Sequence, residues 1–361
     1  MAWNVLSMLR GADGMQACCP VHATPVLENI MLTVGRRTFL GGLTCLGAAA
    51  TGGIPAPLWA QTAVKGKLAP KLRIVIPAAS RSTLDEAGRA LGDALVGLGL
   101  SDEIDYENKE GNGGTTGLAW YAGKYSADSN ALFMGDSNLV GAVALQKPVV
   151  DLSRLRPVAR LTSDYLVVVV AGNSPIKTVN ELTERLRTSP RLTPIAIGSV
   201  GGADHVFAGL LAKSAGTRPE DALYLPFARN FELVDAVLAG KAVAGVSGYG
   251  TFSAELASGK LRAVGVSSKK TSYGVRSVRE QGLDLDMANW RAVFTGQGVT
   301  PARQSEMVEA VKASLAYDLW KKTLKQSYWE QSWLSGTDLS NFIDFETKTT
   351  QLMMQLLKLK A

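Results

Sequence analysis

Short runs of consecutive apolar residues, each followed by a segment with helical spacing, recur along the chain. The runs are "LRIVIP" at 72–77, "ALFMGD" at 131–136, "YLVVVVA" at 165–171, "PIAIG" at 194–198 and "AVAGVSG" at 242–248. A strand with one wet face alternates apolar and polar residues, whereas a continuous apolar run indicates a strand covered by helices on both faces. The sequence therefore predicts an α/β protein with mostly parallel sheets.

The number of strand-and-helix units favours two lobes over a single sheet, and residues 301–360 read as helical with little strand signal. We expect lobe 1 to comprise residues 71–165 and 290–361, lobe 2 residues 166–289, and residues 61–70 to be a linker. In a two-lobed α/β protein the ligand cleft lies between the lobes, at the carboxyl ends of the strands. The loops that follow the strands are therefore the expected functional segments.

Residues 1–60 have the features of a leader. Arg36 and Arg37 precede Thr38-Phe39-Leu40, a weakly apolar stretch follows, and the segment ends in Leu58-Trp59-Ala60 before Gln61. This pattern resembles a twin-arginine signal peptide at 31–60, and we interpret residues 1–30 as the product of a start codon assigned too far upstream of Met31. The alternative is a membrane anchor, but residues 39–54 fall short of the roughly 20 needed to span a bilayer. We expect a periplasmic protein.

Cysteine and histidine usage limits the possible chemistry. Cys18, Cys19, Cys45 and His22 all lie in the predicted leader, which leaves His205 as the one histidine of the mature chain. A disulfide framework, a thiol nucleophile and a two-histidine zinc site are thereby excluded, and we expect no cofactor and no metal. The formal net charge of +6 is scattered along the sequence, so we expect no nucleic-acid surface.

Three loops are rich in glycine and small hydroxyl residues: "PAASRSTLD" at 77–85, "EGNGGTTG" at 110–117 and "GSVGGADH" at 198–205. Each supplies several backbone N–H groups near a helix start, a geometry that binds carboxylate or phosphate. The alternative interpretation is that the polar residues only cap helices and the glycines only turn the chain.

These stretches, together with "VLAGKAVAGVSGYGTF" and "LDMANWRAVF", follow one another in an order and spacing that resembles the substrate-binding proteins of tripartite tricarboxylate transporters, the Bug or TctC family. The resemblance covers nearly the whole mature chain. It implies a two-lobed periplasmic-binding-protein-like fold, with each lobe a mostly parallel sheet flanked by helices, that closes on its ligand by a hinge. The implied partners are a small di- or tricarboxylate and the membrane permease subunits of the transporter, with the receptor itself a monomer.

The resemblance also places ligand contacts on both lobes. The implied ligand-binding residues are Ala79, Ser80, Arg81, Ser82, Thr83, Asp85, Ser199, Gly201, Gly202, Ala203, Asp204, His205, Ser247 and Tyr249. Where the family usually has glycines, this chain has Ser80-Arg81-Ser82. A guanidinium there either pairs with a ligand carboxylate or points to solvent at the cleft rim.

Catalysis by His205 is the competing interpretation, with Asp204, Ser199 or Asp85 as its partner. The chain has no G-x-S-x-G motif, no metal-ligand cluster and no phosphate-binding loop of the G-x-x-x-x-G-K type, so we expect no catalytic residues. A ligand sensor that docks on a signalling receptor is the second alternative, and a periplasmic hydrolase the weakest.

The aromatic residues of the C-terminal region, Trp320, Tyr328, Trp329 and Trp333, are expected in the core of lobe 1. The apolar face of "QLMMQLLKLK" at 351–360 is expected to dock on the same lobe. A membrane-surface helix is the alternative for this segment.

Overall fold

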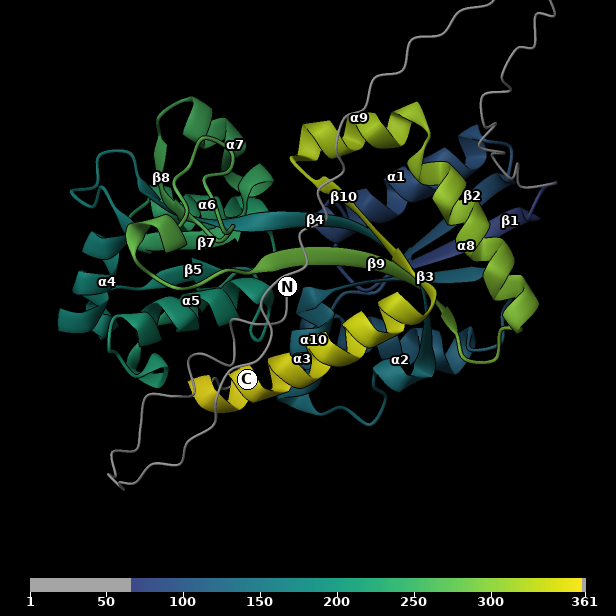
Figure 1. The fold of residues 1–361 in the computed structure, drawn as a ribbon, viewed down its shortest axis with the longest axis horizontal. Coiled ribbons are helices and arrows are strands. Elements are labelled where there is room, and N and C mark those ends of the chain that lie inside the picture. Colours follow the sequence, from purple (N-terminus) through teal and green to yellow (C-terminus); the bar gives the residue numbers. More distant parts are fainter. Residues whose placement is uncertain (1–65, 359–361) are drawn as a thin grey trace, which may run out of the picture. The chain divides into compact units, whose positions relative to one another are not determined.

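Two long strands, β4 (Leu155–Ala171) and β9 (Ala288–Gly296), connect two lobes in the computed structural model, which describes residues 66–358 (Figure 1). Up to Tyr165, β4 pairs with β9, and from Leu166 onward it pairs with β7 and β8. One continuous strand therefore belongs to the sheets of both lobes. The predicted leader lies outside the described residues.

Lobe 1 is built on the first half of β4, on β9 and on four further strands. These are β1 (Ala69–Ile76), β2 (Ser101–Asn108), β3 (Ala131–Asp136) and β10 (Glu330–Ser335). Its helices are α1 (Thr83–Gly97), α2 (Thr115–Lys124), α3 (Ser137–Gln146), α8 (Pro301–Leu315), α9 (Asp318–Ser327) and α10 (Gly336–Leu357). The strand β1 begins inside the range expected to be linker, since Ala69 is already buried and paired with Ser101.

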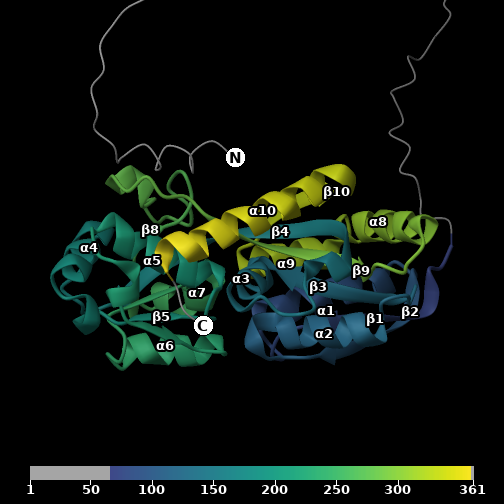
Figure 2. The same cartoon turned by 90° about the horizontal axis from the view of Figure 1, so that it is seen from below.

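Lobe 2 is built on the second half of β4. Its other strands are β5 (Ile195–Ile197), β6 (Tyr224–Pro226), β7 (Ala244–Gly248) and β8 (Leu261–Val266). Its helices are α4 (Val179–Thr188), α5 (Ala203–Ser214), α6 (Asn230–Leu238) and α7 (Tyr249–Ala257). Figure 2 shows the helices of each lobe on both sides of its strands.

The strands follow the order β2-β1-β3-β9-β4-β7-β5-β6, with β10 and β8 also paired to β4. Strands β1 to β3 are mutually parallel, as are β5 to β7, but every pairing of β4 or β9 is antiparallel. The expected two-lobed α/β fold is confirmed, and its sheet is mixed rather than mostly parallel. The reason is that one crossing strand leaves lobe 1 and the other returns, so the two run in opposite directions.

The apolar run at 166–170 shows why the strands do not alternate. Leu166, Val168 and Val170 pack with α4 and α5, whereas Val167 and Val169 point to the other face and pack with α6 and α7. In lobe 1, α1, α8 and α9 cover one face of the sheet, and α2, α3 and α10 cover the other. Helices on both faces explain why residues 166–170 are all apolar, as the sequence predicts.

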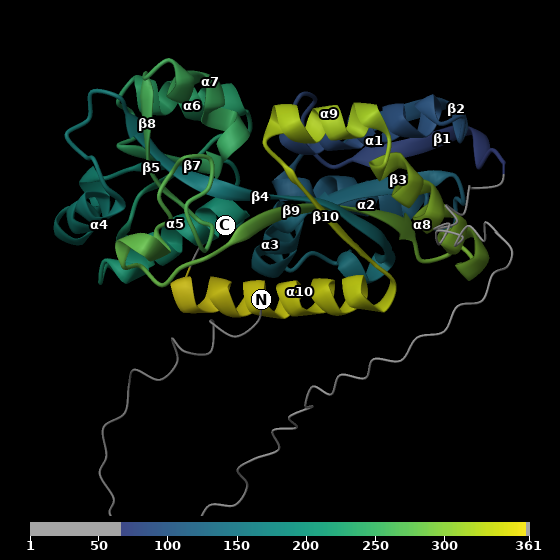
Figure 3. The same cartoon turned by 45° about the horizontal axis from the view of Figure 1, so that its top comes forward.

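The C-terminal region differs from the sequence prediction in two respects. It contains the strand β10, which adds to β4 as an edge strand. Its last helix, α10, runs alongside both lobes (Figure 3), because its 22 residues make it roughly 33 Å long. Met354 and Leu357 pack in one cluster with Ala144 of lobe 1 and Val206 of lobe 2, so this segment docks on lobe 1 as expected and also contacts lobe 2.

No described helix, within residues 66–358, has the length and apolar character required to cross a membrane.

The two lobes touch closely where α3 meets the loop after β5. A Cβ added at Gly141 would lie 1.8 Å from the carbonyl oxygen of Gly201. We expect Gly141→Ala to destabilise the protein by about 1 to 3 kcal/mol, because the backbone of one lobe must shift away from the other. Chemical denaturation measures the change.

The matched control is Gly123→Ala, in the exposed last turns of α2, where an added Cβ meets nothing within 4 Å. That substitution should raise stability by about 0.5 to 1 kcal/mol, since alanine costs less backbone entropy than glycine in a helix. Equal effects of the two substitutions would contradict the close contact between the lobes.

Candidate functional site

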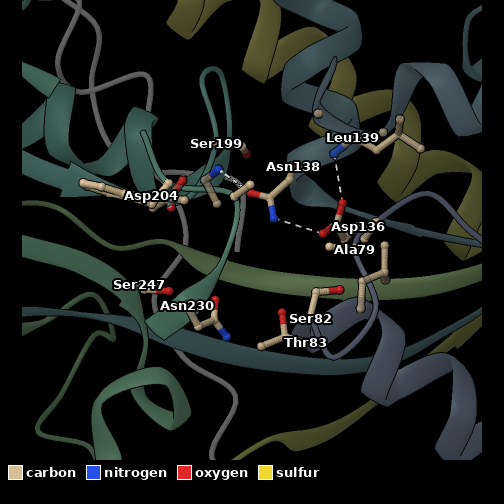
Figure 4. A pocket seen from close by; sticks show the side chains of 18 of the residues that line it. Ala79, Ser82, Thr83, Asp136, Asn138, Leu139, Ser199, Asp204, Asn230 and Ser247 are labelled. Atoms are coloured by element: carbon tan, nitrogen blue, oxygen red, sulfur yellow. Dashed lines mark hydrogen bonds between the residues drawn. The ribbon is translucent and has the colours of Figure 1, made fainter. Parts of the chain in front are cut away.

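A cavity of about 1250 Å³ lies between the lobes. Its walls include residues from the loop that follows each of the six parallel strands. These loops lie within residues 77–84, 110–114, 136–139, 198–204, 226–232 and 247–251. Asn289 and Arg291 of β9 also line it. Figure 4 shows Ser82 and Thr83 of lobe 1 facing Asn230 and Ser247 of lobe 2 across this space. The carboxyl ends of the strands therefore form the site, as in other two-lobed α/β proteins.

The first loop ends in a capped helix start. The Ser82 hydroxyl oxygen accepts a hydrogen bond from the backbone N–H of Asp85 at 3.3 Å and caps α1. Thr83 and Leu84 open the helix toward the cavity, and their backbone N–H groups have no partner among the described residues. Such N–H groups are suited to an anionic ligand. Ala79, Ser82 and Thr83 line the cavity as predicted.

Asp85 lies beneath this loop and not at the cavity surface. Its carboxylate accepts hydrogen bonds from the backbone N–H of Arg81 at 2.8 Å, from Asn108 Nδ2 at 2.9 Å and from Arg89 Nε at 3.0 Å. Burial would raise the pKa of Asp85, but these hydrogen bonds outweigh burial and lower it. Asp85 thus fixes the shape of the loop, and it stands outside the lining because its oxygens are directed at its own chain.

Ser80 and Arg81 line a smaller cavity of about 650 Å³ that shares Ala79, Ser82 and Glu110 with the main one. Arg81 adopts a left-handed backbone conformation, with φ 64°. Its guanidinium is exposed and forms no ion pair or hydrogen bond with any described residue. Across this cavity lies Arg229, which is 3.7 Å from Glu232.

The loop at 198–205 is organised by its own aspartate. The carboxylate of Asp204 accepts hydrogen bonds from the backbone N–H groups of Gly198 and His205. Burial raises the pKa of Asp204 to about 6. Ser199, Ala203 and Asp204 line the cavity, whereas Gly201 and Gly202 lie behind it, where Gly201 adopts φ 82° against α3.

His205 does not line the cavity either. Its side chain is buried, its Nδ1 accepts a hydrogen bond from the backbone N–H of Gly201 at 3.0 Å, and its ring packs edge-on against Tyr224 at 4.6 Å. Burial lowers the pKa of His205 to about 4, so the imidazole is neutral at physiological pH. The ring supports the turn from the side away from the cavity, and no acidic or nucleophilic side chain of residues 66–358 hydrogen-bonds to it.

Tyr249, predicted to touch the ligand, belongs instead to an aromatic cluster between the lobes. Its ring stacks on Tyr273 at 4.5 Å and meets Tyr328 edge-on at 4.7 Å. Tyr328 was expected in the core, but it is 41% exposed and belongs to this cluster. Trp320 and Trp329 are buried in lobe 1 as predicted, and Trp333 packs against the same core while partly exposed.

The polar floor of the cavity was missed by the sequence analysis. Arg291 of β9 donates from Nη1 to Asp164 of β4 at 2.7 Å, and both side chains are buried. Asn289 donates to the same carboxylate at 3.3 Å and accepts from the Ser137 hydroxyl. The guanidinium of Arg291 lies over the ring of Trp329 at 4.3 Å. The available signal was the presence of charged residues inside two long strands, Asp164 in β4 and Arg291 in β9.

A second missed group joins the lobes above this floor. Asp136 caps α3 by accepting from the Leu139 N–H at 2.9 Å, and Asn138 Nδ2 donates to its other oxygen at 3.0 Å. The carbonyl oxygen of the Asn138 side chain accepts from the backbone N–H of Ala203 in lobe 2 at 3.0 Å (Figure 4). Burial raises the pKa of Asp136.

The described residues contain no group of three or more His, Cys, Asp or Glu side chains arranged to hold a metal ion.

Two α/β lobes on crossing strands, with helix starts from both lobes around a cavity, define a solute-binding receptor. The chain belongs to the tripartite tricarboxylate transporter receptor family, whose model matches residues 98–359. Members of this family are solute-binding receptors and not enzymes. No curated protein matches the sequence.

Solved structures of low sequence identity share the fold. A Rhodopseudomonas palustris protein solved with adipate has a TM-score of 0.73 at 18% identity, covering 80% of this chain and 98% of that one. The periplasmic binding protein BugD has a TM-score of 0.70 at 19% identity, with coverage of 80% and 98%. MatC from R. palustris, solved with malate, has a TM-score of 0.65 at 19% identity, with coverage of 80% and 97%.

Substitutions in the buried ion pair of Asp164 and Arg291 test whether this pair stabilises the cavity floor. Arg291→Met should cost about 3 to 5 kcal/mol of unfolding free energy, because the carboxylate of Asp164 is left buried without its cation. The double variant Asp164→Leu/Arg291→Met should be more stable than Arg291→Met alone. A double variant at least as unstable as the sum of the two single variants would show that the pair is not electrostatically coupled.

The buried imidazole predicts a pH-dependent stability difference. In the unfolded chain His205 titrates near pH 6.5, whereas in the fold it titrates near 4, so the unfolded state binds more protons between these values. As the pH falls from 8 to 4, wild type should lose up to about 3 kcal/mol relative to His205→Gln, which keeps an acceptor for Gly201.

The pH dependence of stability must be compared between wild type and His205→Gln, because Asp204 changes the stability of both proteins in the opposite direction. Its raised pKa makes the folded state bind more protons as the pH falls below 6. Urea unfolding at several pH values measures the stability of wild type and of His205→Gln. Parallel pH profiles of the two proteins would contradict the buried neutral state of His205.

Proposed function

We propose that this protein is a periplasmic receptor that captures a small organic acid with two or three carboxylates and delivers it to the membrane permease subunits of a tripartite transporter. The observation that supports this proposal is the cavity between the lobes, onto which α1, α3, α5 and α7 open with their N-terminal ends. Backbone N–H groups and the helix dipole make such ends favourable for anions.

Relatives of known structure support the class of ligand. Malate and adipate, bound in two proteins of the same fold, each carry two carboxylates. In this chain one carboxylate would lie in the main cavity among the helix starts. The other would reach the adjoining cavity, where the guanidinium of Arg81 has no partner within residues 66–358 and can form a charged pair with it.

The proposed working cycle is a hinge motion followed by delivery. The crossing strands β4 and β9 provide the hinge, and the hydrogen bond from Ala203 to Asn138 is of the kind that forms when the lobes close on a ligand. We further propose that the protein acts as a monomer and is exported through its twin-arginine leader.

Ligand-dependent thermal unfolding tests the proposal. The purified protein is screened with mono-, di- and tricarboxylates, amino acids, aromatic acids and uncharged analogues, each at about 1 mM. A ligand at 100 times its dissociation constant adds about 2.7 kcal/mol, which raises the melting temperature by several degrees. We expect a selective rise with one di- or tricarboxylate.

Arg81→Ala should weaken binding of that acid about tenfold or more, the loss of one charged hydrogen bond. The control is Arg191→Ala, an exposed arginine outside both cavities, which should bind as wild type does. If only uncharged compounds raise the melting temperature, the proposed ligand class is wrong.

A further inference from the structure

The helix α7 begins at the cavity without the compensation found at the neighbouring helix starts. Helix α3 is capped by Asp136, and α5 has Asp204 in its first turn. Helix α7 follows Gly248, has no side-chain cap and has no acidic residue in its first turn. The partial positive charge of its N-terminus is therefore not neutralised from within its own sequence.

Arg291 lies in the same part of the cavity wall and is only partly used by the protein. It is 1% exposed, and its hydrogen bonds to Asp164 and Thr162 both come from Nη1. The Nε and Nη2 groups have no hydrogen-bond partner among the described residues. Buried N–H groups of a guanidinium are costly to leave unpaired. Packing over Trp329 holds the guanidinium in place.

One carboxylate is shared by these two positive groups. Asp164 pairs with Arg291 and also lies against the start of α7, since a Cβ on Gly248 would be 2.4 Å from its Oδ2. The carboxylate of Asp164 thus faces a full and a partial positive charge. Asp136 also interacts electrostatically with Arg291, but both of its oxygens are already hydrogen-bonded within lobe 1. The Nε and Nη2 donors of Arg291, which have no partner among the described residues, are therefore the groups available to an anion.

Two hydroxyl groups complete the arrangement. Ser247 and Thr251 line the cavity at the start of α7, and their hydroxyl oxygens are 3.2 Å apart. A single proton serves the hydrogen bond between them, so the second hydroxyl proton is available to another acceptor. A carboxylate here would meet the guanidinium fork from one side and this hydroxyl and the helix start from the other.

We propose that Arg291, Ser247, Thr251 and the N-terminus of α7 form the anchor for one carboxylate of the transported acid. This inference rests on the proposed function and specifies it. Two of the anchor's residues, Thr251 and Arg291, are not among the ligand contacts that the family resemblance implies. The anchor sits on the crossing strand β9 and on lobe 2, so an anion held there bridges the hinge region and the mobile lobe.

The test compares variants of the anchor by calorimetric titration. The probes are acetate, succinate, malate, adipate and citrate, and the variants are Arg291→Lys, which keeps the charge and loses the planar fork, and Thr251→Val, which loses the hydroxyl. For the probe that wild type binds most tightly, Arg291→Lys should weaken binding at least tenfold and Thr251→Val several-fold.

The matched control is Arg160→Lys. Arg160 also lies on a crossing strand, stacks over an aromatic ring at 4.4 Å and donates to a backbone carbonyl, but it does not line the cavity. Arg160→Lys should change the affinity for the same probe less than twofold. Circular dichroism verifies that each variant is folded, and Thr251→Val carries the test if Arg291→Lys does not fold.

The outcomes separate the two proposals. If an acid binds wild type and both anchor variants equally well, the proposed anchor is wrong, but the proposed receptor function is still supported. If none of the acids in either screen binds wild type, the proposed function fails, and the anchor fails with it. Weakening confined to Arg291→Lys and Thr251→Val supports both.

Discussion

The shared strand β4 is the constraint on which the rest of the structure depends. Because its first half pairs with β9 and its second half with β7 and β8, the two lobes have one continuous backbone between them. Each half must be covered by helices on both faces, which fixes the apolar character of residues 166–170. The buried charged pair of the crossing strands, Asp164 and Arg291, lies next to this apolar half, and Arg291 lines the cavity floor.

Charge in the cleft follows from this arrangement. Asp136 and Asp204 are buried at the cavity wall, yet their oxygens accept hydrogen bonds from the protein's own backbone and side chains. They build the loops and do not offer acceptors to a ligand. Donors without a partner among residues 66–358 include those of Arg81, of Arg291 and of the first turns of α1 and α7. A cleft with more than one buried carboxylate is thus still suited to an acid.

The fold could be predicted from the sequence because continuous apolar runs carry the information locally. The loops after the strands could also be located, and Ser82, Thr83, Ser199 and Ser247 do line the cavity. The direction in which each loop side chain points could not be predicted from the sequence pattern. Asp85 and His205 belong to the right loops but point into the protein, since each satisfies a backbone N–H of its own turn.

The polar floor of the cavity could not be predicted from the sequence, for a different reason. Asp164 and Arg291 are separated by 127 residues, and only the register of β4 against β9 brings them together. The strand β10 was missed because its pattern in a helical region is short and lies at a sheet edge, where tertiary pairing decides the conformation.

The long C-terminal helix gives the receptor a built-in resistance to opening. Its start belongs to lobe 1 and its last two turns lie against lobe 2, where Leu357 is fully buried and Met354 nearly so. Any rotation that parts the lobes along this side must expose these side chains, at about 1.5 to 3 kcal/mol each. The last two described turns of α10 therefore hold the two lobes together on this side of the molecule.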